Sequence, residues 1–239
     1  EIRKARKETS GVLGVNIMVA IREFTETAKA AIEEGIDVIF AGAGLPLNLP
    51  SCLKEDSKTR LVPIISSAKA AKLIAKRWMS KYNYVPDAFV LEGPKAGGHL
   101  GFSQEQIEDA DYQLEVLIPQ VVEAVREIEA ESGKKIPVIA GGGIFTGADI
   151  YEALQLGADA VQMATRFVAT EECDADEAFK QAYVNCTKED IGIIATLHNL
   201  CSNPLCRRFT QVINIRLECK SHDRNNRFSA VLQGEFFNS

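Results

Sequence analysis

Residues 91–102 of the chain, LEGPKAGGHLGF, join an apolar run to a loop with four glycines and one histidine, His99. The run 87–91 predicts a buried strand, and the glycines predict a loop whose backbone approaches a flat or anionic ligand. The glycines of this loop are Gly93, Gly97, Gly98 and Gly101, and the first three are candidate cofactor-binding residues. Because the chain has only three histidines, one at a strand-to-loop junction is a candidate acid or base. The alternative is that His99 only hydrogen-bonds across a tight turn.

Strand-like and helix-like segments alternate along the chain. The expected strands are 12–20, 36–43, 61–66, 87–91, 137–140, 160–167 and 190–195. The expected helices are 23–34, 68–81, 111–132, 147–156 and 174–185, with a bend or restart at Pro119. This alternation predicts parallel strands joined by crossover helices.

Two parallel α/β folds fit this order of elements. Seven strands, with one lost before Glu1, predict an eight-stranded TIM barrel, (β/α)8, that lacks its first strand. An open doubly wound sheet is the alternative. The barrel is favoured because candidate site residues follow many strands, and a barrel brings those strand ends to one face. These residues are Asn16, Gly42, Ser66, Glu92, Gly142 and Thr165.

Two loops of the second half have the features of a phosphate site. Residues 140–144, AGGGI, run from a strand into a helix near Thr146, where backbone N–H groups and the helix dipole favour an anion. Residues 163–166, MATR, follow the next strand and add a hydroxyl and a guanidinium. The late loops of barrels commonly form such a site. A simple tight turn at the three glycines is the alternative.

The ordered motifs LEGPKAGGHLGF, PVIAGGGI and GADAVQMATRF resemble the nitronate monooxygenase family, once called 2-nitropropane dioxygenases. They also resemble the related flavin-dependent enoyl-acyl-carrier-protein reductases. The resemblance covers about residues 1–194 and implies a barrel that binds flavin mononucleotide (FMN). It implies that residues 1–195 form the FMN-binding barrel and 196–239 an atypical tail.

The resemblance also implies roles for single residues. Asn16 and Glu92 would contact the flavin or its ribityl chain. His99 stands at the position of the family's catalytic histidine, as a base toward a nitroalkane or as a group that binds the anionic nitronate. The phosphate would be held by Gly142, Gly143, Ala164 and Thr165.

Three departures from the family pattern affect this transfer. The first strand of the family is missing, which would leave two unpaired sheet edges. Ala164 stands where the family more often has glycine, and Glu92 where some members have aspartate.

The segment from His198 onward departs from the pattern of the rest. It carries a net charge of +3, whereas the rest of the chain carries −9. A frameshifted or unrelated tail, disordered or solvated, is the simplest interpretation, and a divergent end is the other. Its possible zinc ligands, Cys201, Cys206, Cys219 and His222, match no strong spacing template, so no metal is expected.

The composition of the chain limits the classes of partner that it is expected to bind. A net charge of −6 and a sequence pI of about 5.3 argue against nucleic acid, and no apolar run approaches the roughly 20 residues of a membrane span. Six irregularly spaced cysteines suggest a reducing cytoplasm. We therefore expect a cytoplasmic enzyme that acts on a small nitronate with O2 and can form a homodimer. An NAD(P)H-dependent enoyl reductase and an inactive flavin-binding barrel are the alternatives.

Overall fold

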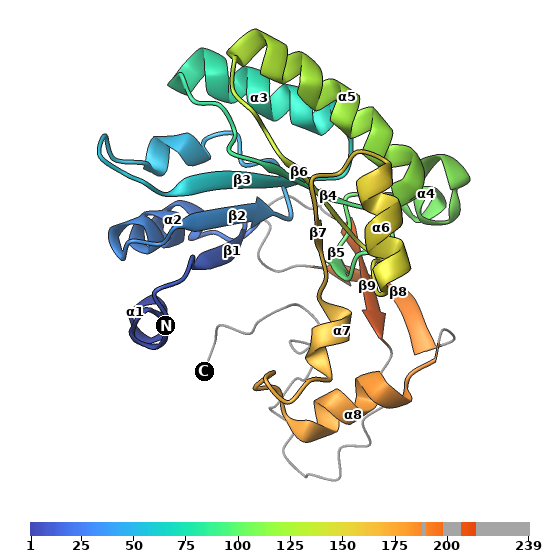
Figure 1. The fold of residues 1–239 in the computed structure, drawn as a ribbon. Helices are drawn as coiled ribbons and strands as arrows, with labels where there is room; N and C mark the ends of the chain where they lie inside the picture. Colours follow the sequence, from blue (N-terminus) through green and yellow to red (C-terminus); the bar gives the residue numbers. More distant parts are fainter. Residues whose placement is uncertain (188–189, 198–206, 214–239) are drawn as a thin grey trace.

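The computed structural model describes residues 1–187, 190–197 and 207–213, and its main feature is a curled parallel sheet (Figure 1). The sheet has the strand order β1-β2-β3-β4-β6-β7, and every neighbouring pair is parallel. Its strands are β1 (Gly14–Met18), β2 (Val38–Gly42), β3 (Arg60–Ile65), β4 (Phe89–Glu92), β6 (Val138–Gly141) and β7 (Ala160–Gln162). The predicted alternation of strands and helices is therefore confirmed.

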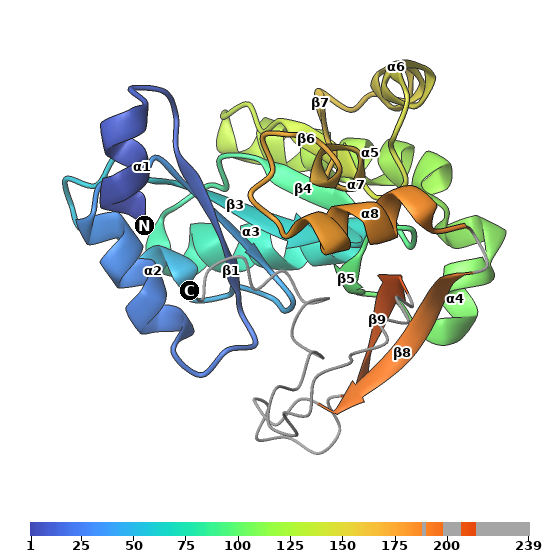
Figure 2. The same ribbon diagram turned by 90° about the horizontal axis from the view of Figure 1, so that it is seen from below.

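The sheet is half of a barrel, not a closed one. Within the described residues β1 and β7 are its two edges, and no strand joins them. The described part of the chain thus forms six parallel strands, fewer than the seven expected for a barrel that lacks its first strand. The curl of the sheet nevertheless gives it an outer and an inner face, as in a barrel (Figures 1 and 2).

Helices cover the outer face of the sheet. Figure 1 shows α3 and α5 side by side above it, with α2 and α6 at its two ends. These helices are α2 (Phe24–Glu33), α3 (Ala68–Tyr82), α5 (Leu114–Ser132) and α6 (Gly147–Gln155). The short elements are α1 (Ile2–Glu8), η1 (Leu49–Cys52), α4 (Gln104–Glu108) and η2 (Ala110–Tyr112). No helix in the described ranges is long and apolar enough to cross a bilayer.

Local sequence explains where the main helices begin and end. The Ser67 side chain accepts a hydrogen bond from the Ala70 amide and starts α3, which ends at Asn83 in the left-handed conformation. Helix α5 contains Pro119 without a break and ends at Gly133, whose φ is 70°. Because proline is best tolerated near a helix start, Pro119 in the second turn leaves the rest of α5 intact.

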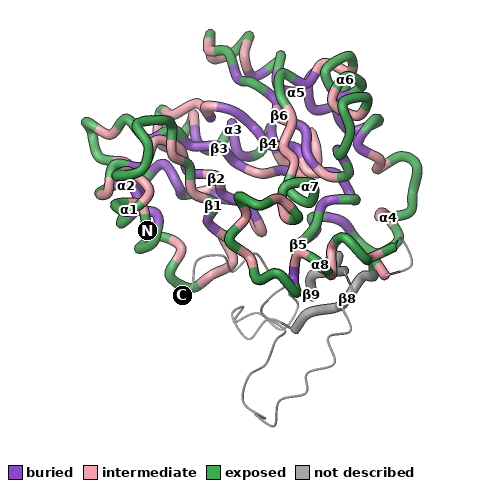
Figure 3. Tube along the Cα trace, turned by 60° about the horizontal axis from the view of Figure 1, so that its bottom comes forward, coloured by how far each residue is buried: buried purple, intermediate pink, exposed green. Residues whose placement is uncertain are grey.

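The core divides into two clusters, one on each face of the sheet. The larger cluster joins the outer face to the helices and includes Trp78, which is fully buried and donates its indole N–H to the Pro46 carbonyl at 3.0 Å. The smaller one lies on the inner face and contains Val62, Ala88 and Val90. Figure 3 shows that the buried segments gather in the central strands and in α3 and α5.

Two segments differ from the sequence prediction. The strand expected at 160–167 stops at Gln162, and residues Thr165–Val168 form the short helix α7. We attribute this to β7 being a sheet edge, because no further neighbour among the described residues extends its pairing. Helix α8 (Glu177–Asn185) follows α7.

The strand expected at 190–195 forms, as β8 (Ile191–Leu197), but it does not join the parallel sheet. It pairs antiparallel with β9 (Arg207–Ile213), which also pairs with the two-residue strand β5 (Gly98–His99). An antiparallel neighbour needs only a short connection, whereas a parallel one needs a crossover of a dozen or more residues. The four possible zinc ligands of the tail, at positions 201, 206, 219 and 222, lie outside the described residues.

The amino-terminal ends of the strands, called here the amino edge, carry a repeated aspartate. Asp37, Asp87 and Asp159 precede β2, β4 and β7. Their carboxylates accept backbone N–H bonds of 2.8–2.9 Å from Leu13, Leu61 and Val138 respectively. Each aspartate thus ties the start of its strand to the start of a neighbouring strand.

Candidate active site

The carboxyl-terminal ends of β4 and β6, part of the carboxyl edge of the sheet, hold two glycine loops against each other. The Gly93 amide donates to the Gly141 carbonyl at 2.9 Å. Gly142 has φ +99°, and a Cβ there would lie 3.0 Å from the Ala96 nitrogen and 3.1 Å from that of Gly93. Only glycine fits at this crossing of two backbones. The histidine loop (residues 93–101) and the three-glycine loop (residues 141–143) therefore form one structure.

The three-glycine loop keeps its amide groups available. Gly143 has φ +88°, and the backbone N–H groups of Gly143 and Ile144 donate no hydrogen bond to any described residue. Helix α6 starts directly after this loop, where Thr146 and Asp149 form a capping box. A run of unbonded amides with a Lys95 side chain beside it fits an anion such as a phosphate.

The second predicted phosphate loop is tied to the first one. Arg166 donates from Nη1 to the Phe145 carbonyl at 3.1 Å, and its guanidinium lies 5.1 Å from the centre of the Phe145 ring. Ala164 is the N-cap of α7 and Thr165 its first residue, and both are exposed. The structure therefore brings the two loops together but directs Arg166 to Phe145.

His99 lies at the end of the histidine loop, on β5. Its backbone pairs with Thr210 of β9, and its side chain is half-buried. Gly98 before it has φ +83°, and a Cβ at Gly97 or Gly98 would meet no atom within 4 Å. Both glycines thus border open space, which fits the expected close approach of a ligand.

Glu92 ends β4, and among the described residues its side chain is hydrogen-bonded to Gln162 at the end of β7. The Gln162 amide donates from Nε2 to Glu92 Oε1 at 3.2 Å. Burial raises the pKa of Glu92 above the usual carboxyl value, and the bond from Gln162 partly opposes that rise. Sequence reasoning missed Gln162. The available signal was its position two residues after Ala160 in the same strand, which places both side chains on the inner face.

Asn16 lies farther from this group. It stands in the middle of β1, in register with Phe40, and not after the strand as expected from the sequence. Phe40 belongs to the inner-face cluster, so Asn16 also faces inward, and it is exposed there. Since β2 and β3 lie between β1 and β4, Asn16 is across the inner face from Glu92.

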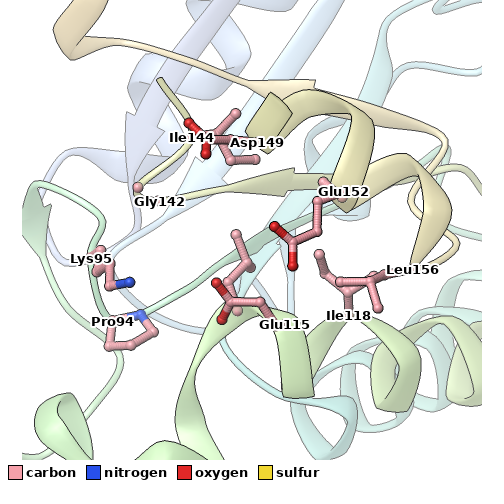
Figure 4. A pocket seen from close by; sticks show the side chains of 12 residues that line it. Pro94, Lys95, Glu115, Ile118, Gly142, Ile144, Asp149, Glu152 and Leu156 are labelled. Carbon is pink, nitrogen blue, oxygen red and sulfur yellow. The ribbon is translucent and has the colours of Figure 1, made fainter. Parts of the chain in front are cut away.

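A separate cavity of about 120 Å³ opens between α5 and α6 (Figure 4). Glu115 and Glu152 project into it from the two helices, while Lys95 and Gly142 border it on another side. Neither His99 nor Glu92 lines it. Because cofactor pockets commonly occupy about 300 Å³ or more, this cavity is too small for a flavin.

Metal binding has no support in the described ranges. They contain no group of three or more His, Cys, Asp or Glu side chains that could hold a metal ion. Cys52, Cys173 and Cys186 are free cysteines.

These features define a parallel α/β half-barrel whose carboxyl edge presents glycine loops suited to an anionic ligand. The nitronate monooxygenase family model matches residues 1–215, so the chain belongs to the nitronate monooxygenase family.

Similar proteins are known from bacteria. A Mycobacterium tuberculosis protein named (3aS,4S,5R,7aS)-5-hydroxy-7a-methyl-1-oxo-octahydro-1H-indene-4-carboxyl-CoA dehydrogenase is 31% identical over 77% of this chain and 45% of its own length. A probable nitronate monooxygenase of Staphylococcus aureus is 32% identical over 52% of this chain and 33% of its own. The solved structure of FabK from Thermotoga maritima superimposes with a TM-score of 0.70 at 29% identity. The superposition covers 90% of this chain and 58% of FabK, so the chain spans about half the length of these proteins or less.

Proposed function

We propose that this chain is an FMN-dependent oxidoreductase that converts an alkyl nitronate and O2 into a carbonyl compound and nitrite. The observation that carries this proposal is the contact between the histidine loop and the three-glycine loop, through Gly93, Ala96 and Gly142. It puts a candidate base and a candidate phosphate site on one edge of the sheet, within a chain of the nitronate monooxygenase family.

The residues at this edge have the chemistry that FMN requires. The loop at Gly142 and Gly143, together with the exposed Thr165 hydroxyl, would hold the phosphate. Gly97 and Gly98 would leave room for the ring, with Glu92 and Asn16 as polar contacts on the inner face, and Gly93, which packs against Leu114, would contribute its backbone. Ala164 would contribute its backbone. The bound flavin would supply electron transfer between substrate and oxygen.

His99 has one of two roles in this proposal. As a general base it takes a proton from the carbon next to the nitro group, which yields the nitronate. As an anion-binding group it pairs with a nitronate that is already formed. In both roles the carbon–nitrogen bond then breaks, the carbon gains oxygen and the nitrogen leaves as nitrite.

The proposed flavin-binding unit is residues 1–195, with 196–239 as an additional segment that supplies β9 beside His99. We place the enzyme in the reducing cytoplasm, in agreement with the three free cysteines of the described ranges. A homodimer stays a prediction.

The test is flavin content followed by nitrite release. The purified chain is expected to show flavin absorption bands and to release nitrite from ethylnitronate or propionate-3-nitronate in air. His99→Ala is expected to keep the flavin and to lower turnover about 100-fold or more. If His99→Ala loses turnover with nitroalkanes but not with nitronates, His99 acts as the base. If it loses turnover with both substrates, His99 binds the anionic nitronate. His222→Ala is the matched control. A colourless wild-type chain would contradict the proposal and favour an inactive barrel.

A second candidate function is an oxidoreductase that acts on a thioester, such as an NAD(P)H-dependent enoyl-thioester reductase. It is favoured by the similarity of 77% of this chain to a relative named as a carboxyl-CoA dehydrogenase. Under anaerobic conditions NADH would then bleach the flavin bands, and crotonyl-CoA would restore them. Nitrite release without reduction by NADH would exclude this candidate.

A further inference from the structure

The last residues of β4 and β7 meet across a glycine. Glu92 pairs in register with Gly141, and Gly141 pairs with Gln162, so the three residues form one row across β4, β6 and β7. Residues in one row of a parallel sheet project from the same face. The row continues the alternation of Val90 and Ile139, which places it on the inner face.

The missing side chain of Gly141 is what allows this contact. Strands two apart in a sheet are separated by roughly 10 Å, so the side chains of Glu92 and Gln162 must both extend over the strand between them. A Cβ at Gly141 would lie 3.3 Å from the Gln162 Cβ, in the space that the bond crosses. The hydrogen bond of 3.2 Å between Glu92 and Gln162 therefore depends on glycine at this position.

The bond also decides what the carboxyl group offers to a ligand. Glu92 has no cationic partner among the described residues, and its burial favours the neutral acid. With one oxygen accepting from Gln162, the orientation of the carboxyl group is fixed, and its second oxygen can form a hydrogen bond with a ligand atom.

We propose that Gln162, reaching over Gly141, is a positioning residue that fixes the orientation of the Glu92 carboxyl group, so that its second oxygen forms a hydrogen bond with the bound cofactor. This inference rests on the proposed function, because it takes the cofactor to be FMN. It adds a residue on β7 whose effect on the cofactor passes entirely through Glu92.

A double-mutant cycle with FMN as the titrant tests this dependence. Gln162→Leu is expected to weaken FMN binding about tenfold, which is the effect of one buried hydrogen bond, and to shift the bound flavin spectrum. In a Glu92→Leu background the same change is expected to have no further effect on either readout. Gly141→Ala is expected to reproduce Gln162→Leu while both polar side chains remain. Urea unfolding of each variant verifies that the chain is folded.

The outcomes separate the two proposals. If Gln162→Leu weakens FMN binding equally with and without Glu92, Gln162 acts on its own and the positioning role is wrong. If Gln162→Leu changes neither affinity nor spectrum, the inference is also wrong, while wild-type FMN binding leaves the proposed function standing. If the wild-type chain binds no FMN, the proposed function itself fails and this inference fails with it.

Discussion

The amino edge and the carboxyl edge of the sheet differ in the chemical groups that lie beside the backbone. At the amino edge, carboxylates saturate backbone N–H groups and meet cations: Asp87 accepts from Leu61, from the Tyr84 hydroxyl and from Lys134 at 2.8 Å. At the carboxyl edge, glycines replace side chains, the Gly143 and Ile144 amides have no partner in the described part of the chain, and the Glu92 carboxyl accepts from the Gln162 amide. The difference teaches that one edge is made for stability and the other for a ligand.

The largest effect is expected for the variant Asp87→Ala, at the amino edge. The side chain of Asp87 is only 11% exposed, and its loss leaves the Leu61 amide and Lys134 without their partner. We expect a loss of about 3 kcal/mol in the free energy of unfolding, measured in urea, with FMN affinity of the folded protein unchanged. The matched control is Asp159→Ala, an exposed aspartate with one backbone bond, expected to cost about 1 kcal/mol. A fall in the FMN affinity of the folded Asp87→Ala protein would contradict the contrast between the two edges.

An intermediate effect is expected for Gly142→Ala at the other edge. The positive φ and the crowding by Ala96 and Gly93 make alanine strained, at a cost of about 2 kcal/mol. FMN affinity is expected to fall at least about tenfold, because the loop must shift. Gly147→Ala is the matched control, since nothing lies within 4 Å of its Cβ and alanine favours the helix. Unfolding in urea and FMN titration measure both, and unchanged FMN affinity in the Gly142→Ala variant would contradict the role of this loop.

The smallest effect is a pH dependence of opposite sign at the two edges. Burial raises the pKa of Glu92, so its folded state prefers the proton, and stability is lost as pH rises from about 4.5 through the raised value. Glu92→Gln removes this loss, and the variant is expected to gain stability relative to wild type between about pH 4 and pH 8.

Asp37 provides the opposite case. Its bonds from Arg6 and then from the Leu13 amide lower the pKa of Asp37, so its stabilising effect is present above about pH 4 and is lost as pH falls through the lowered value. Asp37→Asn is therefore expected to be destabilising at about pH 7 and to match wild type in acid. Unfolding curves at several pH values measure both variants, and the same slope for both would contradict the contrast between the edges.

Sequence reasoning predicted the elements of the fold better than their arrangement at the ends of the sheet. Apolar periodicity is a local signal, and it located the main helices and strands. Whether β8 joins the parallel sheet or pairs antiparallel with β9 depends on the competition between the two partners, and no local sequence pattern encodes that choice.

The same distinction holds at the candidate site. Gly142 and the histidine loop were visible because glycine runs and a rare histidine stand out in one segment. Gln162 was missed because its importance arises from a partner 70 residues away and from a glycine on the strand between them. Asn16 was placed at a strand end, although the residues that follow it extend β1 to Met18.

The aspartates of the amino edge also bear on the order of folding. Their backbone bonds connect residues only 21 to 26 positions apart, so each closes a short loop around one strand–helix–strand unit. The Glu92–Gln162 bond closes a loop of 70 residues, and a longer loop costs more chain entropy to close. Contacts of low sequence separation form first in such chains. The units β1–β2, β3–β4 and β6–β7 can therefore assemble singly, and the carboxyl edge is completed only when β4, β6 and β7 have docked.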